Sequence, residues 1–212
     1  MREDEKLALL LSPPFDHSEP SPGYLRGYPP GVRENGGQYN HAALWLAIAF
    51  ARRGDGTRAR NVLRLLNPIE RARDADSVWL YGLEPYAVAA DVYRLDGRIG
   101  MGGWSWYTGS AAWTYRAWVE EIMGLRVSGD TMRVEPVIPN WWEGFRLRYR
   151  RGEAIYEIQV ENPDGCERGV LWVELDGRRL QDGVVPLEHG LIQHRIRVRM
   201  GQASPPGASP PT

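Results

Sequence analysis

The sequence predicts an α+β protein in which a helical region, ending at Gly124, precedes an antiparallel β region. Before Gly124, glycine-rich polar loops alternate with apolar segments that have helical spacing. After Gly124, apolar and polar residues alternate along short segments separated by turn residues. Helices and strands that are segregated along the chain are typical of α+β proteins. We therefore expect two domains, at residues 1–124 and 125–200, and a disordered tail at 201–212, which is rich in proline, glycine and serine.

The composition excludes several classes of function. Of the 212 residues, 42% are hydrophobic and 25% are charged, which indicates a globular chain. The formal net charge of -1 provides no basic field for nucleic acid. One cysteine and four scattered histidines predict neither a disulfide nor a metal site, and no apolar run approaches the roughly 20 residues that span a membrane. We accordingly expect a cytoplasmic location for this chain, although a full-length relative can be anchored in a membrane.

The chain before the first complete helix is expected to be irregular. Residues 1–11 resemble the end of a helix, which the prolines after Ser12 would stop. Because that helix has no visible beginning, we expect that Met1 is not the start of a domain. Residues 12–34 are predicted to form a long loop, and loops of this length in compact proteins usually serve a function.

Helices alternate with loops in the rest of the first region. Pro85 suits the first turn of a helix and Glu84 suits the positive end of its dipole, so a helix is predicted there. Nearly apolar helices alternate with more amphipathic ones, which suits a double-layered helical barrel, but they are too few to close one. The predicted helices cover residues 39–53, 57–66, 84–95 and 110–123.

The region after Gly124 is predicted to consist of antiparallel hairpins with one face in water. Glycine-containing turns separate segments in which apolar and polar residues alternate. The predicted turns lie at Gly129-Asp130, Arg151-Gly152 and Asp176-Gly177.

Five stretches of the sequence together resemble glycoside hydrolase family 94, the inverting β-glucoside phosphorylases. They occur in the family's order and spacing over about residues 7–163, and the similarity extends to cyclic β-1,2-glucan synthases and β-1,2-oligoglucan phosphorylases. The resemblance implies the C-terminal half of an (α/α)6 barrel followed by a small antiparallel β-sandwich-like domain. The stretches are GYPPGVRENGGQYNHAALW, LLNPI, EPYAVAADVY, GGWSWYTGSAAW and VEPVIPNWWEGF.

The resemblance also implies a reaction. Family members cleave β-glucosides, β-1,2-glucan among them, with inorganic phosphate and inversion, and release α-glucose 1-phosphate. Phosphate replaces the water of an inverting hydrolase, so one carboxylic acid suffices and no cofactor is expected. The family's general-acid aspartate lies upstream of the region matched here. We therefore expect no catalytic acid in this chain and no activity of the chain alone.

By the same resemblance, His41, Thr108 and Gly109 correspond to phosphate-binding positions. A threonine hydroxyl and backbone N–H groups at a helix start suit an anion, and a protonated histidine donates a charge-assisted hydrogen bond. The structural alternatives are a buried histidine bonded to a carbonyl and a plain helix cap at Thr108.

The candidate sugar-binding residues are crowded near the first complete helix and in two later stretches. Read without the resemblance, the crowded polar residues are either a helix cap with a solvated turn or the lining of a site. A carboxylate can accept hydrogen bonds from two sugar hydroxyls. The alternative for Arg33 and Glu34 is a surface ion pair, which stabilises little. The alternative for Asp91 is a solvated helix position, and for the two tryptophans it is packing in the barrel floor. These candidates are Arg33, Glu34, Gln38, Asp91, Trp104 and Trp106.

The expected partners are a β-glucan oligosaccharide and phosphate. An incomplete barrel would expose a large apolar face, so we also expect a missing N-terminal half or self-association. Two other functions stay open: a non-catalytic fragment that binds carbohydrate or complements a partner, and a helical scaffold without a ligand.

Overall fold

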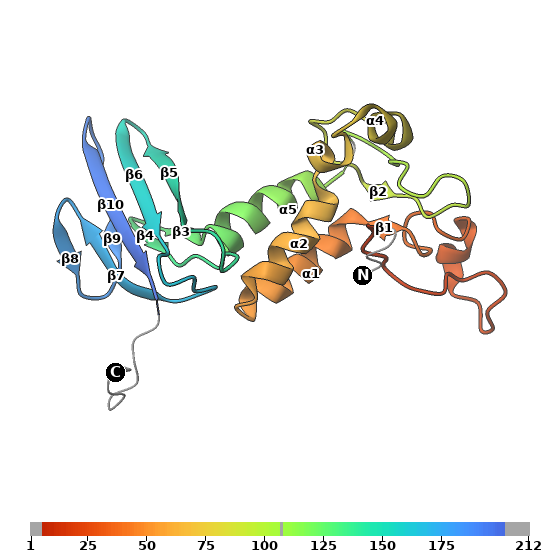
Figure 1. The fold of residues 1–212 in the computed structure, drawn as a ribbon, viewed down its shortest axis with the longest axis horizontal. Coiled ribbons are helices and arrows are strands. Elements are labelled where there is room, and N and C mark those ends of the chain that lie inside the picture. Colours follow the sequence, from red (N-terminus) through yellow and green to blue (C-terminus); the bar gives the residue numbers. More distant parts are fainter. Residues whose placement is uncertain (1–5, 107, 202–212) are drawn as a thin grey trace. The chain divides into compact units, whose positions relative to one another are not determined.

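The computed structural model describes residues 6–106 and 108–201, which contain helices and sheets in an α+β arrangement. The chain divides into two compact units. Helices predominate in the first unit and sheets in the second (Figure 1). The first unit comprises Met1–Phe50 and Arg58–Ala117, and the second comprises Ala51–Thr57 and Trp118–Thr212.

Three of the four predicted helices are confirmed. The segments 39–53 and 57–66 form α1 and α2, and the segment 110–123 forms α5, which continues as a π-helical stretch. The structure adds two short helices between α2 and α5, and a 3₁₀ helix in the long loop. The elements are Gly23–Gly27 (3₁₀), α1 Asn40–Arg52, α2 Gly56–Leu66, α3 Pro68–Arg71, α4 Ala75–Tyr81, α5 Ser110–Arg116 and Ala117–Ile122 (π).

Local signals explain where these helices start and stop. Gly54 follows α1 with a φ of 81°, and its N–H donates to the carbonyl of Ala51 at 2.8 Å, which closes the helix end. Helix α3 begins after Asn67, whose side chain accepts a hydrogen bond from the amide of Ile69. These are the caps that sequence patterns predict.

The helix predicted at 84–95 is wrong. The segment makes turns and then the short strand β2 (Asp91–Val92), which pairs antiparallel with β1 (Gln38–Tyr39). Residues 89–92 are all buried. A short apolar run of this kind has no periodicity that separates a helix from an extended segment. The extended form prevails because its backbone groups bond to residues 40 and 102–104.

The expected helix end at the N-terminus is also not found in the part that the structure describes. Residues 6–11 are irregular, and residues 1–5 lie outside the described residues. Leu7 and Ala8 are buried, the amide of Ala8 donates to the side chain of Gln38, and the amide of Leu10 donates to Gly37. Contacts with the segment before α1 therefore hold these residues.

The β region contains the predicted hairpins, arranged in two sheets. A five-stranded sheet has the order β5-β6-β10-β7-β8, and a three-stranded sheet has the order β3-β4-β9. The turns predicted near Gly129, Gly152 and Gly177 connect β3 to β4, β5 to β6, and β7 to β8. The strands are β3 Leu125–Ser128, β4 Thr131–Val134, β5 Gly144–Arg151, β6 Ala154–Glu161, β7 Val170–Leu175, β8 Arg178–Leu180, β9 Val185–Pro186 and β10 Gln193–Met200.

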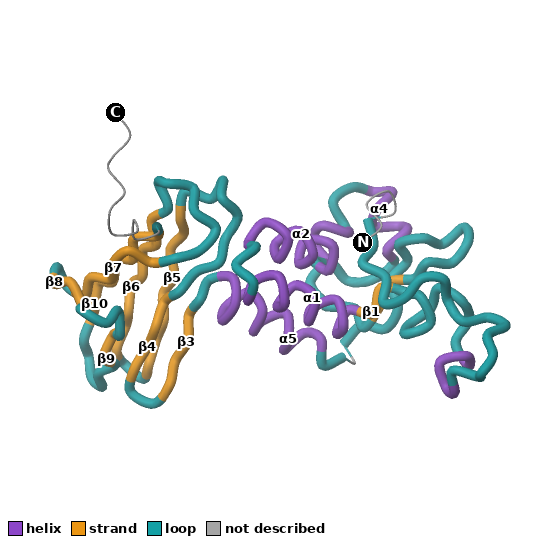
Figure 2. The backbone as a smooth tube through the Cα atoms, turned by 90° about the horizontal axis from the view of Figure 1, so that it is seen from below, coloured by secondary structure: helices purple, strands orange, loops and turns teal. Residues whose placement is uncertain are grey.

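The expectation of a wholly antiparallel region needs one correction. Strand β10 pairs parallel with β6 and antiparallel with β7, so it inserts between two strands that are consecutive in sequence (Figure 2). Parallel neighbours need a crossover of a dozen residues or more, which residues 162–192 supply. Alternate residues of β6 and β10 are buried, and the intervening residues form the partly exposed face.

Candidate functional site

The carbonyl groups of Ala89 and Ala90 join the two polar motifs that the sequence singles out. Ala89 accepts hydrogen bonds from Asn40 Nδ2 at 2.7 Å and from Ser110 Oγ at 3.2 Å. Ala90 accepts from the Asn40 amide at 3.0 Å and donates to the carbonyl of Trp104 at 2.6 Å. The starts of α1 and α5 and the aromatic loop before α5 therefore meet at one extended segment.

The three phosphate-binding candidates lie around this junction. His41 is in the first turn of α1, and its ring centroid lies 5.0 Å from that of Trp45 and 5.9 Å from that of Trp113 on α5. His41 Nε2 is buried and has no hydrogen-bond partner among the described residues. This nitrogen therefore has an open bonding position, and no carbonyl of the described residues satisfies it.

Thr108 and Gly109 immediately precede α5. Thr108 Oγ1 accepts a hydrogen bond from the Ser110 amide at 3.0 Å and lies 2.6 Å from Ser110 Oγ. Because Ser110 Oγ donates to Ala89, the proton of Thr108 points toward Ser110 in this arrangement. Gly109 is exposed and occupies the cap position of the helix. Thr108 thus bonds to the first residue of α5 from outside the helix, and its role at a phosphate site stays a prediction.

Arg33 and Glu34 form a half-buried pair. Arg33 Nε lies 3.4 Å from Glu34 Oε2, and the side chains are 22% and 15% exposed. The guanidinium lies 5.5–5.8 Å from the ring centroids of Tyr28, Tyr39 and Trp104. Glu34 Oε2 is buried without a hydrogen-bond partner in the described part of the chain. The pair is therefore enclosed by aromatic rings, unlike a solvated surface ion pair.

Asp91 is fully buried beside this pair, so its alternative as a solvated helix position is wrong. Asp91 Oδ2 accepts a hydrogen bond from the Arg33 amide at 3.0 Å, whereas Oδ1 is buried and has no partner among the described residues. Burial raises the pKa of Asp91, although the amides of Arg33 and Trp104 and the Arg33 guanidinium oppose the shift. A Cβ on Gly103 would lie 2.0 Å from Asp91 Oδ1, so only glycine fits there.

The electrostatics of Arg33 follow from the same neighbours. Burial lowers the pKa of Arg33, but Glu34, Tyr28 and Asp91 outweigh that effect and raise it overall. Arg33 also has a φ of 48°, a left-handed conformation that costs energy for a residue with a side chain. The hydrogen bond to Asp91 and the ring contacts hold it there. Strained residues of this kind often lie at functional sites.

The two tryptophans expose their rings, so they do not pack in a core. Trp104 is 55% exposed and adjoins Arg33, whereas Trp106 is 72% exposed. Trp106 Nε1 donates to Glu84 Oε1 at 3.1 Å, and its ring packs edge-on against Tyr86. Hydrogen bonds, including that from Trp106, lower the pKa of Glu84. Trp106 therefore belongs to a second aromatic group, which it forms with Tyr86.

Gln38 does not face this group. Its side chain is fully buried, accepts from the Ala8 amide at 3.0 Å and donates to Asn40 Oδ1 at 3.0 Å. It also accepts from Arg71 Nη2 at 3.3 Å. The amide therefore bonds to protein atoms, and its position behind Asn40 supports the Ala89 junction.

Sequence reasoning overlooked two positioning residues. Asn40 forms three of the contacts at the junction, and its place at a helix start is a signal that could have found it. Glu84 was assigned to a helix dipole, but it orients Trp106 from 22 residues away, a contact for which the sequence has no signal.

Metal and membrane sites are not evident in the described residues. No group of three or more His, Cys, Asp or Glu side chains there could hold a metal ion. No helix within residues 6–106 and 108–201 combines the length and apolar character needed to cross a bilayer.

The chain is similar in sequence to carbohydrate-active enzymes. It is 44% identical over 157 residues, 74% of its length, to the cyclic β-(1,2)-glucan synthase NdvB of Rhizobium meliloti. It is 30% identical over 195 residues, 91% of its length, to the solabiose phosphorylase of Paenibacillus borealis. It is 32% identical over 169 residues, 79% of its length, to the N,N'-diacetylchitobiose phosphorylase of Vibrio furnissii.

The matched region is a small part of each relative. It spans 6% of the synthase, 25% of the solabiose phosphorylase and 21% of the chitobiose phosphorylase. Residues 2–124, more than half of the chain, match the family model described as the catalytic domain of the glycosyl hydrolase 94 superfamily. The chain therefore belongs to the glycosyl hydrolase 94 superfamily.

Proposed function

We propose that the protein containing this chain transfers a glucosyl unit between a β-glucoside and inorganic phosphate, with inversion and release of α-glucose 1-phosphate. The observation that supports this proposal is the junction at Ala89, where Asn40 and Ser110 bond to one carbonyl two residues before Asp91. His41 follows Asn40 and Thr108 lies two residues before Ser110 in the sequence. Two relatives are named as phosphorylases, and the name of the synthase supports β-1,2-glucan as the substrate.

Phosphate is proposed to bind at His41, Thr108 and Gly109. The open Nε2 of His41 supports this role because it can donate a hydrogen bond when protonated. Gly109 is exposed, so its N–H group can contribute a further donor. The Thr108 proton would turn from Ser110 Oγ to the phosphate, while Ser110 keeps its bond to Ala89. The site thus offers hydrogen-bond donors from a histidine ring, a hydroxyl group and a backbone amide.

The sugar is proposed to bind against Arg33, Glu34, Trp104 and Trp106, with support from Asp91. Glu34 Oε2 lies 3.4 Å from Arg33 Nε but has no hydrogen-bond partner among the described residues, and such an oxygen can accept a sugar hydroxyl. Asp91 is buried beneath the pair and is proposed to hold the Arg33 backbone in place. Exposed indole rings can stack on the apolar face of a sugar.

Gln38 is proposed to act indirectly by holding Asn40. The general acid is proposed to lie outside this chain, in the missing part of the (α/α)6 barrel. The helices of the first unit would then supply the phosphate side of a completed site. The short chain alone is accordingly expected to bind ligands without turnover.

The test compares the isolated chain with the complete protein encoded by the full open reading frame. Each is incubated with phosphate and β-1,2-glucooligosaccharides, and glucose 1-phosphate is measured. We expect release by the complete protein only, and a loss of at least about a hundredfold in Thr108→Ala, the usual scale for losing one charge-stabilising donor. Thr131→Ala in the β3–β4 hairpin is the control. Turnover by the isolated chain would place the acid within it, and no product from the complete protein would refute the reaction.

Carbohydrate binding without catalysis is the second candidate function. The exposed rings of Trp104 and Trp106 could bind a sugar, and no residue of this chain is proposed as the catalytic acid. Calorimetry of the complete protein distinguishes the two. Oligosaccharide binding that is independent of phosphate, together with no product, would favour this alternative.

A further inference from the structure

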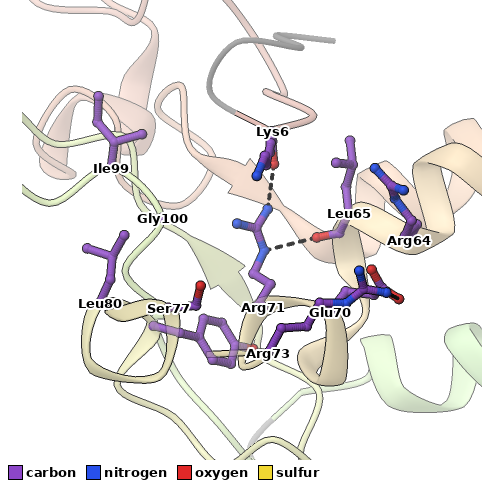
Figure 3. A pocket seen from close by; sticks show the side chains of 11 residues that line it. Lys6, Arg64, Leu65, Glu70, Arg71, Arg73, Ser77, Leu80, Ile99 and Gly100 are labelled. Atoms are coloured by element: carbon purple, nitrogen blue, oxygen red, sulfur yellow. Dashed lines mark hydrogen bonds and ion pairs between the residues drawn. The ribbon is translucent and has the colours of Figure 1, made fainter. Parts of the chain in front are cut away.

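A basic cavity in the first unit lies apart from the residues assigned to sugar and phosphate. It has a volume of about 270 Å³ and is lined by residues of α2, α3, α4 and the segment at Gly100 (Figure 3). None of its lining residues is a candidate for the site described above. Four cations reach it against one acid: Lys6, Arg64, Arg71 and Arg73, with Glu70.

The cations that line this cavity outnumber its one lining acid, although Asp74 also interacts electrostatically with Lys6. Arg73 pairs with Glu70. Lys6, Arg64 and Arg71 have no carboxylate within 4.0 Å in residues 6–106 and 108–201. Lys6, Arg64 and Arg73 are exposed, whereas Arg71 is partly buried. A cation removed from water without an acid is costly, so Arg71 favours an anion in this cavity.

Arg71 is the most enclosed of these cations and has an incomplete set of hydrogen bonds. Nε donates to the Leu65 carbonyl at 3.0 Å, and Nη2 donates to the Lys6 carbonyl at 2.7 Å and to Gln38 Oε1 at 3.3 Å. A guanidinium has five N–H groups, so the two on Nη1 are left. Among the described residues, none accepts from them.

The remaining nitrogen faces the open space of the cavity. In Figure 3 it points away from both dashed contacts, toward the side formed by Leu80, Ile99 and Gly100. Gly100 lies on this side of the cavity, and a Cβ there would lie 4.0 Å from Arg71 Nη1. One wall of the cavity is therefore cationic, and the other is apolar.

We propose that this cavity binds a small oxyanion, a phosphate or carboxylate group, through Arg71 Nη1, with Lys6 and Arg64 at its rim. The volume equals about nine water molecules, which accommodates such a group with a short carbon skeleton against Leu80 and Ile99. Oxyanions are the strong hydrogen-bond partners of guanidinium groups. The site is distinct from the phosphate position proposed at His41 and Thr108.

A chain of hydrogen bonds connects the cavity with the Ala89 junction. Arg71 donates to Gln38, Gln38 donates to Asn40, and Asn40 donates to the Ala89 carbonyl. The side-chain amides of Gln38 and Asn40 therefore report on occupancy of the cavity. They supply a readout besides binding itself.

The test is an NMR titration of the chain with inorganic phosphate, with acetate as the carboxylate arm and sodium chloride as the ionic-strength control. We expect saturable shifts of Arg71 Nε–H, the Gly100 amide and the Gln38 side-chain amide. Phosphate shifts alone would identify a phosphate site, and acetate shifts a general oxyanion site. No saturable shift with either ion would overturn the proposal.

Rim variants keep the test independent of folding, because Arg71 also ties together three segments. Lys6→Gln and Arg64→Gln should each weaken binding about fivefold, the effect of one cation about 4 Å from the anion in water. The control is Arg178→Gln, which removes one positive charge from an exposed position on β8 and should leave the binding affinity unchanged. Thr108→Ala should leave the Arg71 shift intact while it removes binding at the proposed phosphate position. Equal binding by the rim variants and the parent chain would refute the proposal.

The acids Glu3, Asp4 and Glu5 precede Lys6 in sequence and provide a rival occupant. The triple variant Glu3→Gln, Asp4→Asn, Glu5→Gln should change phosphate affinity by less than about fivefold if its charges stay in solvent. A much larger gain would show that the chain's own acids fill the cavity, and it would overturn the assignment to an external ligand.

Discussion

Asp91 is the residue in which burial and charge conflict most directly. It is fully enclosed between the Arg33 amide and the backbone at Gly103, and one of its oxygens has no partner among the described residues. Burial raises its pKa above the ordinary 3.8, and the nearby carboxylate of Glu34 adds to the effect, while Arg33 opposes it.

The raised pKa of Asp91 predicts a pH dependence of stability. Above about pH 3.8 the unfolded chain releases the proton that the folded state retains, so this carboxyl lowers the free energy of unfolding as pH rises through its folded pKa. Asp91→Asn removes that titration. The change in the free energy of unfolding from pH 4 to pH 7, measured by urea denaturation, should therefore be more favourable in the variant than in the parent chain.

The control for this measurement is Asp96→Asn, an exposed aspartate in the loop that follows β2. It should keep the pH dependence of the parent chain. An identical pH dependence in Asp91→Asn would contradict the raised pKa.

The long loop before α1 is held by one buried side chain. Asn35 Oδ1 accepts from the Phe15 amide at 2.7 Å, and Nδ2 donates to the carbonyls of Phe15 and Tyr28, each at 2.8 Å. These three bonds close a segment of 20 residues and place Arg33 and Glu34 next to Asp91. The loop is thus ordered by contacts that its proline and glycine content does not reveal.

We predict that Asn35→Ala lowers the free energy of unfolding by about 3 kcal/mol, because it leaves three partly buried backbone groups without partners. Urea denaturation measures this change. Asn67→Ala removes one helix cap and should cost about 1 kcal/mol. A smaller effect at Asn35 than at Asn67 would show that the loop is ordered by other contacts.

The balance between local signals and distant contacts also decides which elements can be predicted from sequence patterns. Helices α1, α2 and α5 have the periodic apolar face and the glycine or proline at their ends that patterns detect. The segment 84–95 carries the same signals, a proline after an acid, but its buried run 89–92 satisfies its backbone against distant residues. Tertiary hydrogen bonds therefore override the local preference.

Within the second unit, the α1–α2 turn joins the β region through Glu167. Its carboxylate accepts hydrogen bonds from the Gly56 amide at 3.2 Å and from the Thr57 hydroxyl. Glu167 therefore caps the start of α2 from 110 residues away in sequence. Arg168 Nη1 donates to the Arg53 carbonyl at 3.3 Å. Residues 51–57 accordingly belong to the second unit, although a boundary at Gly124 would separate them from it.

We predict that Glu167→Ala lowers the free energy of unfolding by about 1–2 kcal/mol and speeds amide exchange at Gly56 and Thr57, because the helix start loses its acceptor. Hydrogen exchange with mass spectrometry locates the change. Glu153→Ala in the exposed β5–β6 turn is the matched control and should alter neither quantity. Unchanged exchange at residues 56 and 57 would contradict this cap.

Some features of the candidate site can be predicted from sequence motifs, whereas others depend on tertiary packing. The positions of His41, Arg33, Glu34 and Thr108 follow from motifs, since their residue types and spacing are local. The inward orientation of Gln38 and the pairing of Glu84 with Trp106 depend on segments far apart in sequence. Their roles as site residues stay predictions.

By itself, the sequence determined the α+β class, three helices, the hairpin turns and the family, because periodicity, caps, turn residues and motifs are local. Only the tertiary structure decided that residues 89–92 are extended, that β10 lies parallel to β6, and that Asp91 is buried. It also decided that Arg71 faces a cavity without a balancing acid among the described residues. Each of these depends on which distant groups supply hydrogen bonds and charge once the backbone is removed from water.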